Sequence, residues 1–152
     1  MTTWIEDRLQ ILNLIASYSH AADGVDPEAY ANCFTDDGTF IGRVGMPDER
    51  AVSGREALVA FAANAISRRG DRQNRHIQTN TMIVSQSDTE AFARTYLLVM
   101  TSEGEKAPVP GLTSVYEDEL VKTPKGWRIR VRRTLPDRKG VLRRPAAKDP
   151  QS

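Results

Sequence analysis

The chain carries only two histidines, and His76 opens the short alternating stretch RHIQTNT. Far upstream, Asp23 closes an apolar helical pattern in the segment YSHAADGVDPEAY. A histidine that donates one ring N–H to a carboxylate is held in a fixed tautomer, and its other nitrogen is then free to accept a proton. The pairing would also stabilise the Asp23 carboxylate, because the C-terminal end of a helix disfavours a negative charge. The two residues are therefore candidates for a proton-abstracting pair, whereas the alternative is a solvated aspartate and a histidine satisfied in the core.

Tyr18 lies about a turn and a half before Asp23 in the same helical pattern. From there its hydroxyl can orient a substrate oxygen or act as an acid, although a tyrosine that only packs is the simpler interpretation. Asp26 is a rival carboxylate, but Pro27 directly after it favours a helix N-cap with proline at the first helical position. His20 falls on the polar side of the pattern, and we expect it to face solvent.

The composition is that of one soluble globular domain: 152 residues, of which 39% are hydrophobic and 27% charged. No apolar run approaches the roughly 18 residues of a membrane-spanning helix, and the N-terminus lacks the pattern of a secretory signal. We therefore expect a cytoplasmic protein without a membrane partner. The formal net charge of +1 provides no general field for nucleic acid, which we exclude as a partner.

Nothing in the sequence calls for a cofactor. The single cysteine, Cys33, cannot form an internal disulfide, and with two scattered histidines it lacks the spacing of a zinc site. It also has no neighbouring base in sequence, so we interpret it as a small core residue. The sequence has no glycine-rich phosphate loop, serine elbow or paired-cysteine motif. We expect neither a metal nor an organic cofactor.

Three helices are expected in the first half of the chain. The first spans residues 4–22 and stops at Gly24. Its wide buried face is expected to comprise Ile5, Leu9, Leu12, Ile15 and Ala16, flanked by Trp4, Ile11 and Tyr18. A second, short helix begins after Asp26 and runs to about residue 34. A third follows a capping box formed by Ser53 and Glu56 and buries Ala57, Leu58, Phe61, Ala62, Ala65 and Ile66.

Strands are expected around and after the third helix. The pattern predicts a turn at TDDGTF, a strand over 39–44 and a short return at 51–52, then strands over 76–84, 90–101, 112–122 and 127–134. Helices followed by such a run indicate an α+β fold in which a mostly antiparallel sheet buries one face against the helices. A strongly curved sheet wrapped around the first helix is one of several topologies that share this order. We expect this domain to cover 1–135, and 136–152 to be a flexible basic tail.

Strand periodicity suggests which side chains contact a substrate. Asn80 has the same parity as His76, and Tyr96 and Met100 share one parity of the strand over 90–101. Because both faces of that strand are apolar, one face is expected to line a cavity and the other to contact another subunit. We therefore expect a homo-oligomer, either a dimer or a trimer.

The last strand, RIRVRR, alternates arginines with apolar residues. The arginines most simply face solvent, but Arg132 or Arg133, near the strand end, can reach a pocket rim and bind a carboxylate or phenolate oxygen. Phe40 and Tyr116 complete the expected substrate contacts.

The order and spacing of several motifs resemble the SnoaL-like group of the nuclear transport factor 2 superfamily. They are the helix-one tyrosine, D-x-x-D, F-x-x-D-G, G-R-x-x-L, H-x-x-T-N and G-W-R-I, and the likeness covers residues 4–134. The resemblance implies a cone-shaped α+β barrel with a hydrophobic pocket between a curved sheet and the first helix. Scytalone dehydratase, a hexachlorocyclohexane dehydrochlorinase, limonene epoxide hydrolase, ketosteroid isomerase and polyketide cyclases share this fold, so function must be argued from the pocket.

Asp23 and His76 match a pair found in the dehydratase-like members, where the aspartate orients a histidine that removes a proton. The resemblance thus implies a cofactor-independent lyase or isomerase for a small hydrophobic, aromatic or cyclic substrate, with Asp23, His76 and Tyr18 as catalytic residues. Hydrolysis by carboxylate-activated water is a chemical variant. The alternative is a non-catalytic binding or assembly subunit that resembles the small β subunit of aromatic-ring dioxygenases, and the presence of both Asp23 and His76 favours the enzyme.

Overall fold

The computed structural model describes residues 3–24 and 26–137. Its elements are, in chain order, α1 (Trp4–Gly24), α2 (Pro27–Asn32), β1 (Phe34–Gly42), β2 (Arg50–Ser53), α3 (Arg55–Ser67), β3 (Arg72–Gln86), β4 (Glu90–Glu103), β5 (Val109–Thr123) and β6 (Gly126–Pro136). The predicted α+β class is confirmed. The predicted tail, 136–152, falls almost wholly outside the described residues.

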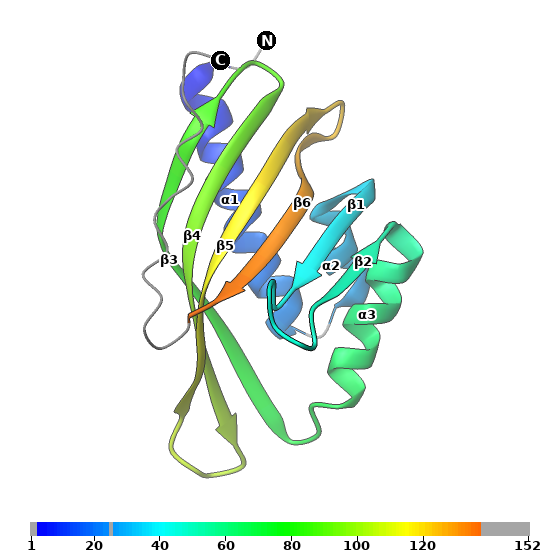
Figure 1. The fold of residues 1–152 in the computed structure, drawn as a ribbon, viewed down its shortest axis with the longest axis vertical. Helices are drawn as coiled ribbons and strands as arrows, with labels where there is room; N and C mark the ends of the chain where they lie inside the picture. Colours follow the sequence, from blue (N-terminus) through cyan, green and yellow to red (C-terminus); the bar gives the residue numbers. More distant parts are fainter. Residues whose placement is uncertain (1–2, 25, 138–152) are drawn as a thin grey trace.

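The six strands form one sheet in the order β2-β1-β6-β5-β4-β3. Neighbouring strands run antiparallel, as predicted, except that β1 and β6 are parallel. Among the described residues the sheet stays open, with β2 and β3 at its edges. Figure 1 shows α1 lying across one face of the sheet and α3 standing beside β2. Helix α1 packs mainly against β3 and also against α2 and β6, and α3 packs against α2, β1 and β2.

The buried face of α1 differs from the one expected. It consists of Ile11, Leu14, Ile15, Tyr18 and Ala21, together with Asp7 and Asp23. Of the five central positions expected inside, only Ile15 is buried, and Ile5, Leu9, Leu12 and Ala16 are exposed. Of the three flanking positions, Ile11 and Tyr18 are buried and Trp4 is exposed. The four residues from Ile11 to Tyr18 recur at i, i+3, i+4 and i+7, which is the tighter helical stripe. Within the described ranges, no helix combines the length and the apolar character needed to cross a membrane.

The start of α1 is anchored to the sheet through Asp7. One carboxylate oxygen accepts a hydrogen bond from Trp127 Nε1 at 3.0 Å, and the other accepts one from Lys122 Nζ at 2.9 Å. Asp7 is 4% exposed, so these contacts offset the cost of burying its charge. This anchor fixes the N-terminal end of the helix that carries Tyr18 and Asp23.

Two local predictions in the first half are wrong. The expected turn TDDGTF is part of β1, where the register with β6 shifts between Phe34 and Thr39 and a Cβ on Gly38 would come within 2.8 Å of the Phe34 Cβ. The expected capping box is absent, because Gly54 is the N-cap of α3 without a side-chain bond, and Ser53 Oγ instead pairs with Thr39 Oγ1 at 2.9 Å. A glycine fits there because its φ of 86° is strained for other residues.

Candidate active site

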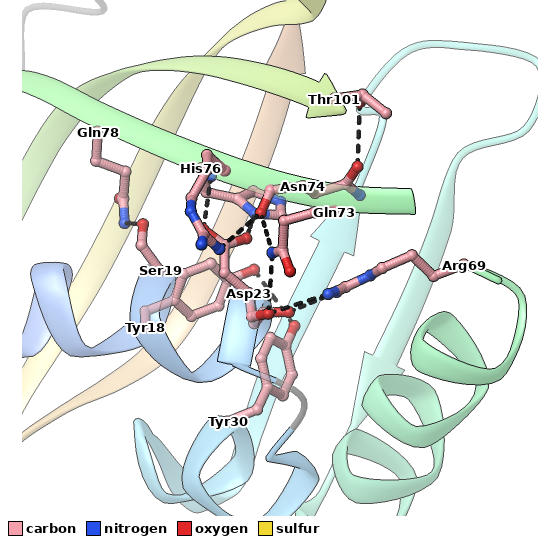
Figure 2. Close-up of polar contacts among 12 residues, drawn as sticks. Tyr18, Ser19, Asp23, Tyr30, Arg69, Gln73, Asn74, His76, Gln78 and Thr101 are labelled. Atoms are coloured by element: carbon pink, nitrogen blue, oxygen red, sulfur yellow. Dashed lines mark hydrogen bonds and ion pairs between the residues drawn. The ribbon is translucent and has the colours of Figure 1, made fainter. Parts of the chain in front are cut away.

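Asp23 and His76 meet where the end of α1 faces the first half of β3. The His76 ring Nδ1 lies 2.6 Å from Asp23 Oδ1, and the main-chain N–H of His76 donates to Asp23 Oδ2 at 2.9 Å. Figure 2 shows the Asp23 side chain pointing from the helix end toward His76. A carboxylate only accepts hydrogen bonds, so Nδ1 carries the proton and Nε2 is the nitrogen left to accept one.

The end of α1 is held by donors from two other segments. Arg69, which follows α3, donates from Nη1 to the Asp23 main-chain oxygen at 3.0 Å and from Nη2 to the Ala22 oxygen at 2.7 Å. Gln73 Nε2 also reaches the Asp23 oxygen, at 3.4 Å. The last carbonyls of a helix have no partner within it, and a cation there balances the helix dipole. These contacts fix the position of the Asp23 carboxylate.

A second amide ties the same strand to the middle of α1. Gln78 Nε2 donates to the main-chain oxygen of Ile15 at 2.7 Å and to Ser19 Oγ at 2.6 Å (Figure 2). Gln78 follows His76 by two residues on β3, so both side chains point toward the helix. The spacing between α1 and this part of β3 is therefore set on both sides of the pair.

His76 lies at the wall of a cavity of about 290 Å³ between α1, α3 and the sheet. The apolar lining comprises Ala21, Ala22, Phe40, Gly42, Phe61, Ala62, Ala65, Ile66, Leu97, Val99, Leu112 and Pro136. The polar lining comprises Tyr18, Tyr30, Arg43, Arg50, Arg69, Asn74, His76, Ser114, Tyr116 and Thr134. A mostly apolar pocket with a few polar groups is the usual form of a small-molecule site, and this volume suits a small ligand.

Three tyrosines cluster at the inner part of this cavity. The ring centroid of Tyr18 lies 5.1 Å from that of Tyr30 and 5.8 Å from that of Tyr116, and the Tyr18 and Tyr30 hydroxyls are 3.4 Å apart. Burial raises the pKa of Tyr18, while the nearby Arg132 cation acts in the opposite direction. Burial, and then the proximity of Tyr18, raise the pKa of Tyr30 and of Tyr116 well above the ordinary value. The three phenols are thus neutral hydrogen-bonding groups near neutral pH.

Arg132 lies behind these rings and not at the cavity rim, which corrects the prediction. Its side chain is fully buried and pairs with Asp118 through Nε and Nη2, both at 2.7 Å. The guanidinium carbon lies 4.0 Å from the Tyr18 ring centroid and 4.2 Å from that of Tyr116. Burial by itself would lower the pKa of Arg132, but the Asp118 carboxylate more than offsets it and the pKa is raised. Arg132 thus supports the tyrosines from behind.

Of the other predicted contacts, two line the cavity and three do not. Phe40 and Tyr116 line it, whereas Asn80, Tyr96 and Met100 are not among the lining residues. Tyr96 is 58% exposed, because β4 turns Ala93, Leu97 and Val99 toward the core and the opposite parity outward. The prediction chose the wrong face of this strand.

Asn80 is displaced by a bulge in β3. It has a φ of 54°, and the register with β4 shifts beside it. An extra residue reverses the alternation of a strand, so Ile83 is buried while Met82 and Val84, which share the parity of His76, are exposed. The same effect moves Arg132 inward, because the register of β6 with β5 shifts at Arg130.

Several lining residues were not predicted. Ser114 and Thr134 are 2% and 8% exposed, and their hydroxyls have no hydrogen-bond partner among the described residues. Ser114 has the parity of Tyr116 on β5, so strand alternation was a signal that could have identified it. Arg43 and Arg69 lie in loops and Arg50 in the edge strand β2, where the sequence pattern does not indicate which way a side chain points. Among the described residues, no group of three or more His, Cys, Asp or Glu could hold a metal ion.

The other polar residues considered from the sequence lie outside the cavity. Asp26 is the N-cap of α2 and accepts from the Ala29 N–H at 2.9 Å, as predicted. His20 is exposed on α1, also as predicted. Cys33 is buried, and burial raises the pKa of its thiol to about 11. None of the three lines the cavity.

The fold and the site place the protein in a general class, that of α+β proteins with one open sheet and a cavity between this sheet and the helices. The chain belongs to the SnoaL-like domain family, whose family model matches residues 3–133. This confirms the resemblance inferred from the motifs. No curated protein matches the chain significantly.

Solved structures agree on the fold. A protein of unknown function from Mycobacterium tuberculosis is 31% identical, with a TM-score of 0.76, and the match covers 89% of this chain and 73% of that one. A Novosphingobium aromaticivorans protein proposed to be an aromatic ring hydroxylase is 26% identical, with a TM-score of 0.74, and covers 89% and 92%. A Catenulispora acidiphila protein in complex with S-DNPA is 29% identical, with a TM-score of 0.72, and covers 86% and 92%.

Proposed function

We propose that the protein is a cofactor-independent lyase or isomerase in which His76 removes a proton from a small hydrophobic, aromatic or cyclic substrate. The observation that carries this proposal is the 2.6 Å contact between His76 Nδ1 and Asp23 Oδ1, at the wall of a largely apolar cavity. A positioned general base contributes about 10²–10⁴-fold to a rate, provided that it can reach the proton. The ligand complex of the Catenulispora relative is consistent with small-molecule binding by this fold.

The proton balance assigns a role to each member of the pair. His76 Nε2 takes a proton from a carbon of the substrate, and the electron pair of that C–H bond either expels a leaving group or moves toward a carbonyl oxygen. Asp23 keeps the ring oriented and stabilises the imidazolium that forms. The same proton then passes from His76 to the leaving group or to another carbon, which gives elimination or isomerisation.

Neutral hydroxyls of the cavity can stabilise an oxygen that gains negative charge. Tyr18, Ser114 and Thr134 are buried at its lining, and the last two hydroxyls have no protein partner in the described structure. Fixed donors of this kind stabilise a developing oxyanion more than water does, since they need no reorientation. We assign to Tyr18 the role of hydrogen-bond donor, because its raised pKa disfavours full proton transfer.

Deuterium incorporation into 2-tetralone, a bicyclic aromatic ketone with acidic C–H bonds, tests the proposal. We expect the protein to accelerate incorporation from D₂O, followed by proton NMR, and His76→Gln to return it to the buffer rate. His20→Gln is the matched control, because His20 is the other histidine and is exposed on α1. Equal rates for the wild-type protein and His76→Gln would contradict a base at position 76.

A second candidate function is that of a non-catalytic binding or assembly subunit. It is favoured by the similarity to the Novosphingobium protein, which is proposed to be an aromatic ring hydroxylase. Co-purification of the chain with the product of a neighbouring gene for a Rieske-type large subunit would support this alternative. A chain that purifies alone and accelerates exchange through His76 would contradict it.

We also propose that two copies associate through the outer face of the sheet. Ile77, Tyr96 and Leu98 share this face; Ile77 and Tyr96 are 45% and 58% exposed, and Leu98 pairs in register with Ile77. Exposed apolar side chains that are contiguous on one face are typical of an interface. A homodimer would cover them and leave the cavity, on the opposite face, accessible.

A further inference from the structure

The rim of the cavity is cationic. Three of its lining residues are arginines, Arg43, Arg50 and Arg69, and none of the described residues that line it is an aspartate or a glutamate. The inner lining is uncharged and buried, and it includes Tyr18, Tyr30, Tyr116 and Ser114, which are at most 3% exposed. Arg50 is exposed, whereas Arg43 and Arg69 are half-buried. The site therefore has an uncharged inner end and a positively charged outer end.

The three arginines differ in how far protein carboxylates neutralise them. Arg43 is paired with Asp48, at 2.7 Å. That direct bond, with a smaller contribution from the Arg50 charge, lowers the pKa of Asp48. Arg50 itself has no carboxylate within ion-pair distance among the described residues, and neither has Arg69. Arg69 binds the main-chain oxygen of Asp23 but not its side chain, because both carboxylate oxygens of Asp23 contact His76.

Both Arg50 and Arg69 are nevertheless held in place. The guanidinium carbon of Arg50 lies 4.9 Å from the ring centroid of Phe61, which also lines the cavity. Arg69 is fixed by its two bonds to the carbonyls of Ala22 and Asp23 (Figure 2), and these use two of its five N–H groups. Cations that are fixed and not neutralised at a cavity favour an anionic ligand, because their orientation costs no further entropy on binding.

From these observations we infer that the substrate of the proposed reaction carries a carboxylate, which binds Arg50 and Arg69 at the rim while its ring fills the apolar interior. That the bound anion is the substrate of a reaction at His76 rests on the proposed function, whereas the binding of an anion at the rim does not. Arg69 bonds the main-chain oxygen of the residue whose side chain holds His76, so the anionic group lies close to the C–H bond that His76 attacks. Neutralising that group makes a neighbouring carbon easier to deprotonate.

Equilibrium binding of 2-naphthoate and of 2-naphthamide, its uncharged counterpart, tests the inference. We expect the wild-type protein to bind naphthoate at least tenfold more tightly by titration calorimetry at pH 7. Arg50→Gln and Arg69→Gln should each reduce this preference at least threefold without weakening naphthamide binding. Arg68→Gln is the matched control, because Arg68 is adjacent in sequence, exposed and outside the cavity lining.

Three results would overturn the inference. They are equal binding of the two probes by the wild-type protein, an unchanged preference in both arginine variants, and a preference that disappears in His76→Gln alone, which would make the imidazole the anion site. If Arg69→Gln also weakens naphthamide binding, that part of the loss is structural. The role of Arg69 then stands only if the preference for naphthoate falls as well and Arg69→Lys, which keeps the charge, restores it. Failure of the proposed function is separable, since it would remove exchange without changing the naphthoate preference.

Discussion

Asp23 contacts His76 through both carboxylate oxygens, one at the ring Nδ1 and the other at the main-chain N–H. The main-chain bond fixes the carboxylate, and the ring bond fixes the tautomer. In Asp23→Asn the amide oxygen can still accept from the main chain, but its NH₂ group then faces Nδ1. The ring would present Nδ1 as an acceptor and carry its proton on Nε2, which removes the base. We expect deuterium incorporation to fall by about 10²-fold or more.

The control for this substitution is Asp26→Asn. Asn and Asp are equivalent N-caps, so the start of α2 should be retained, and the exchange rate should stay within about twofold of the wild-type rate if the pair acts as proposed. A similar loss in both variants would assign the effect to the connection between α1 and α2 and not to the pair.

The α+β class and the family could be predicted from the sequence because both depend on element order and on motif spacing. The meeting of Asp23 and His76 was predicted from the resemblance, since no local rule brings position 23 to position 76. Local physics explained only why such a pair would be useful: an aspartate at a helix C-terminus needs compensation, and a histidine donates to it.

Two of the predicted substrate contacts, Asn80 and Arg132, failed where the strands depart from strict alternation. The bulge at Asn80 and the register shift at Arg130 each reverse a face, which moved Met82 outward and Arg132 into the core. A bulge leaves little signal in a single sequence. The only hint is the residue type, because asparagine adopts a positive φ more readily than most residues, as Asn80 does here. For β4, where alternation holds, both faces are apolar, so the pattern could not tell which one faces the cavity.

Tyr96→Glu should prevent association through the outer sheet face. A charge at the centre of an apolar interface must be buried without a partner, so we expect light scattering after gel filtration to give the mass of one chain, against two for the wild-type protein. Leu12→Glu is the matched control, because Leu12 is a 42% exposed apolar residue on α1. Dissociation by Leu12→Glu but not by Tyr96→Glu would place the interface on the helix.

The buried pair of Asp118 and Arg132 should be costly to break. Arg132→Met leaves the Asp118 carboxylate, which is 0% exposed, without its bidentate partner and removes the cation beneath the tyrosine rings. We expect the free energy of unfolding in urea to fall by about 3–5 kcal/mol. Arg55→Met, which breaks the exposed pair with Glu28, should cost less than about 1 kcal/mol. The double variant Asp118→Leu/Arg132→Met should be more stable than Arg132→Met, and the opposite order would contradict this account.

Cys33 should make the fold less stable in alkali. Burial raises the pKa of its thiol to about 11, from an ordinary value of 9.0. Below pH 9 the thiol is protonated in both states and contributes no pH dependence. Between pH 9 and 11 the unfolded chain releases the proton and the folded chain retains it, so the free energy of unfolding falls, by up to about 2–3 kcal/mol.

The buried tyrosines also have raised pKa values, so they too lower the free energy of unfolding as pH rises. Comparison with Cys33→Ala isolates the contribution of the thiol. We expect urea unfolding curves to show a smaller decline for Cys33→Ala than for the wild-type protein over pH 9–11. Folded wild-type protein should also react slowly with iodoacetamide at pH 8, since only the thiolate is nucleophilic. Identical declines in the two proteins, or rapid alkylation of the folded chain, would mean that the Cys33 thiol ionises as freely as one in solvent.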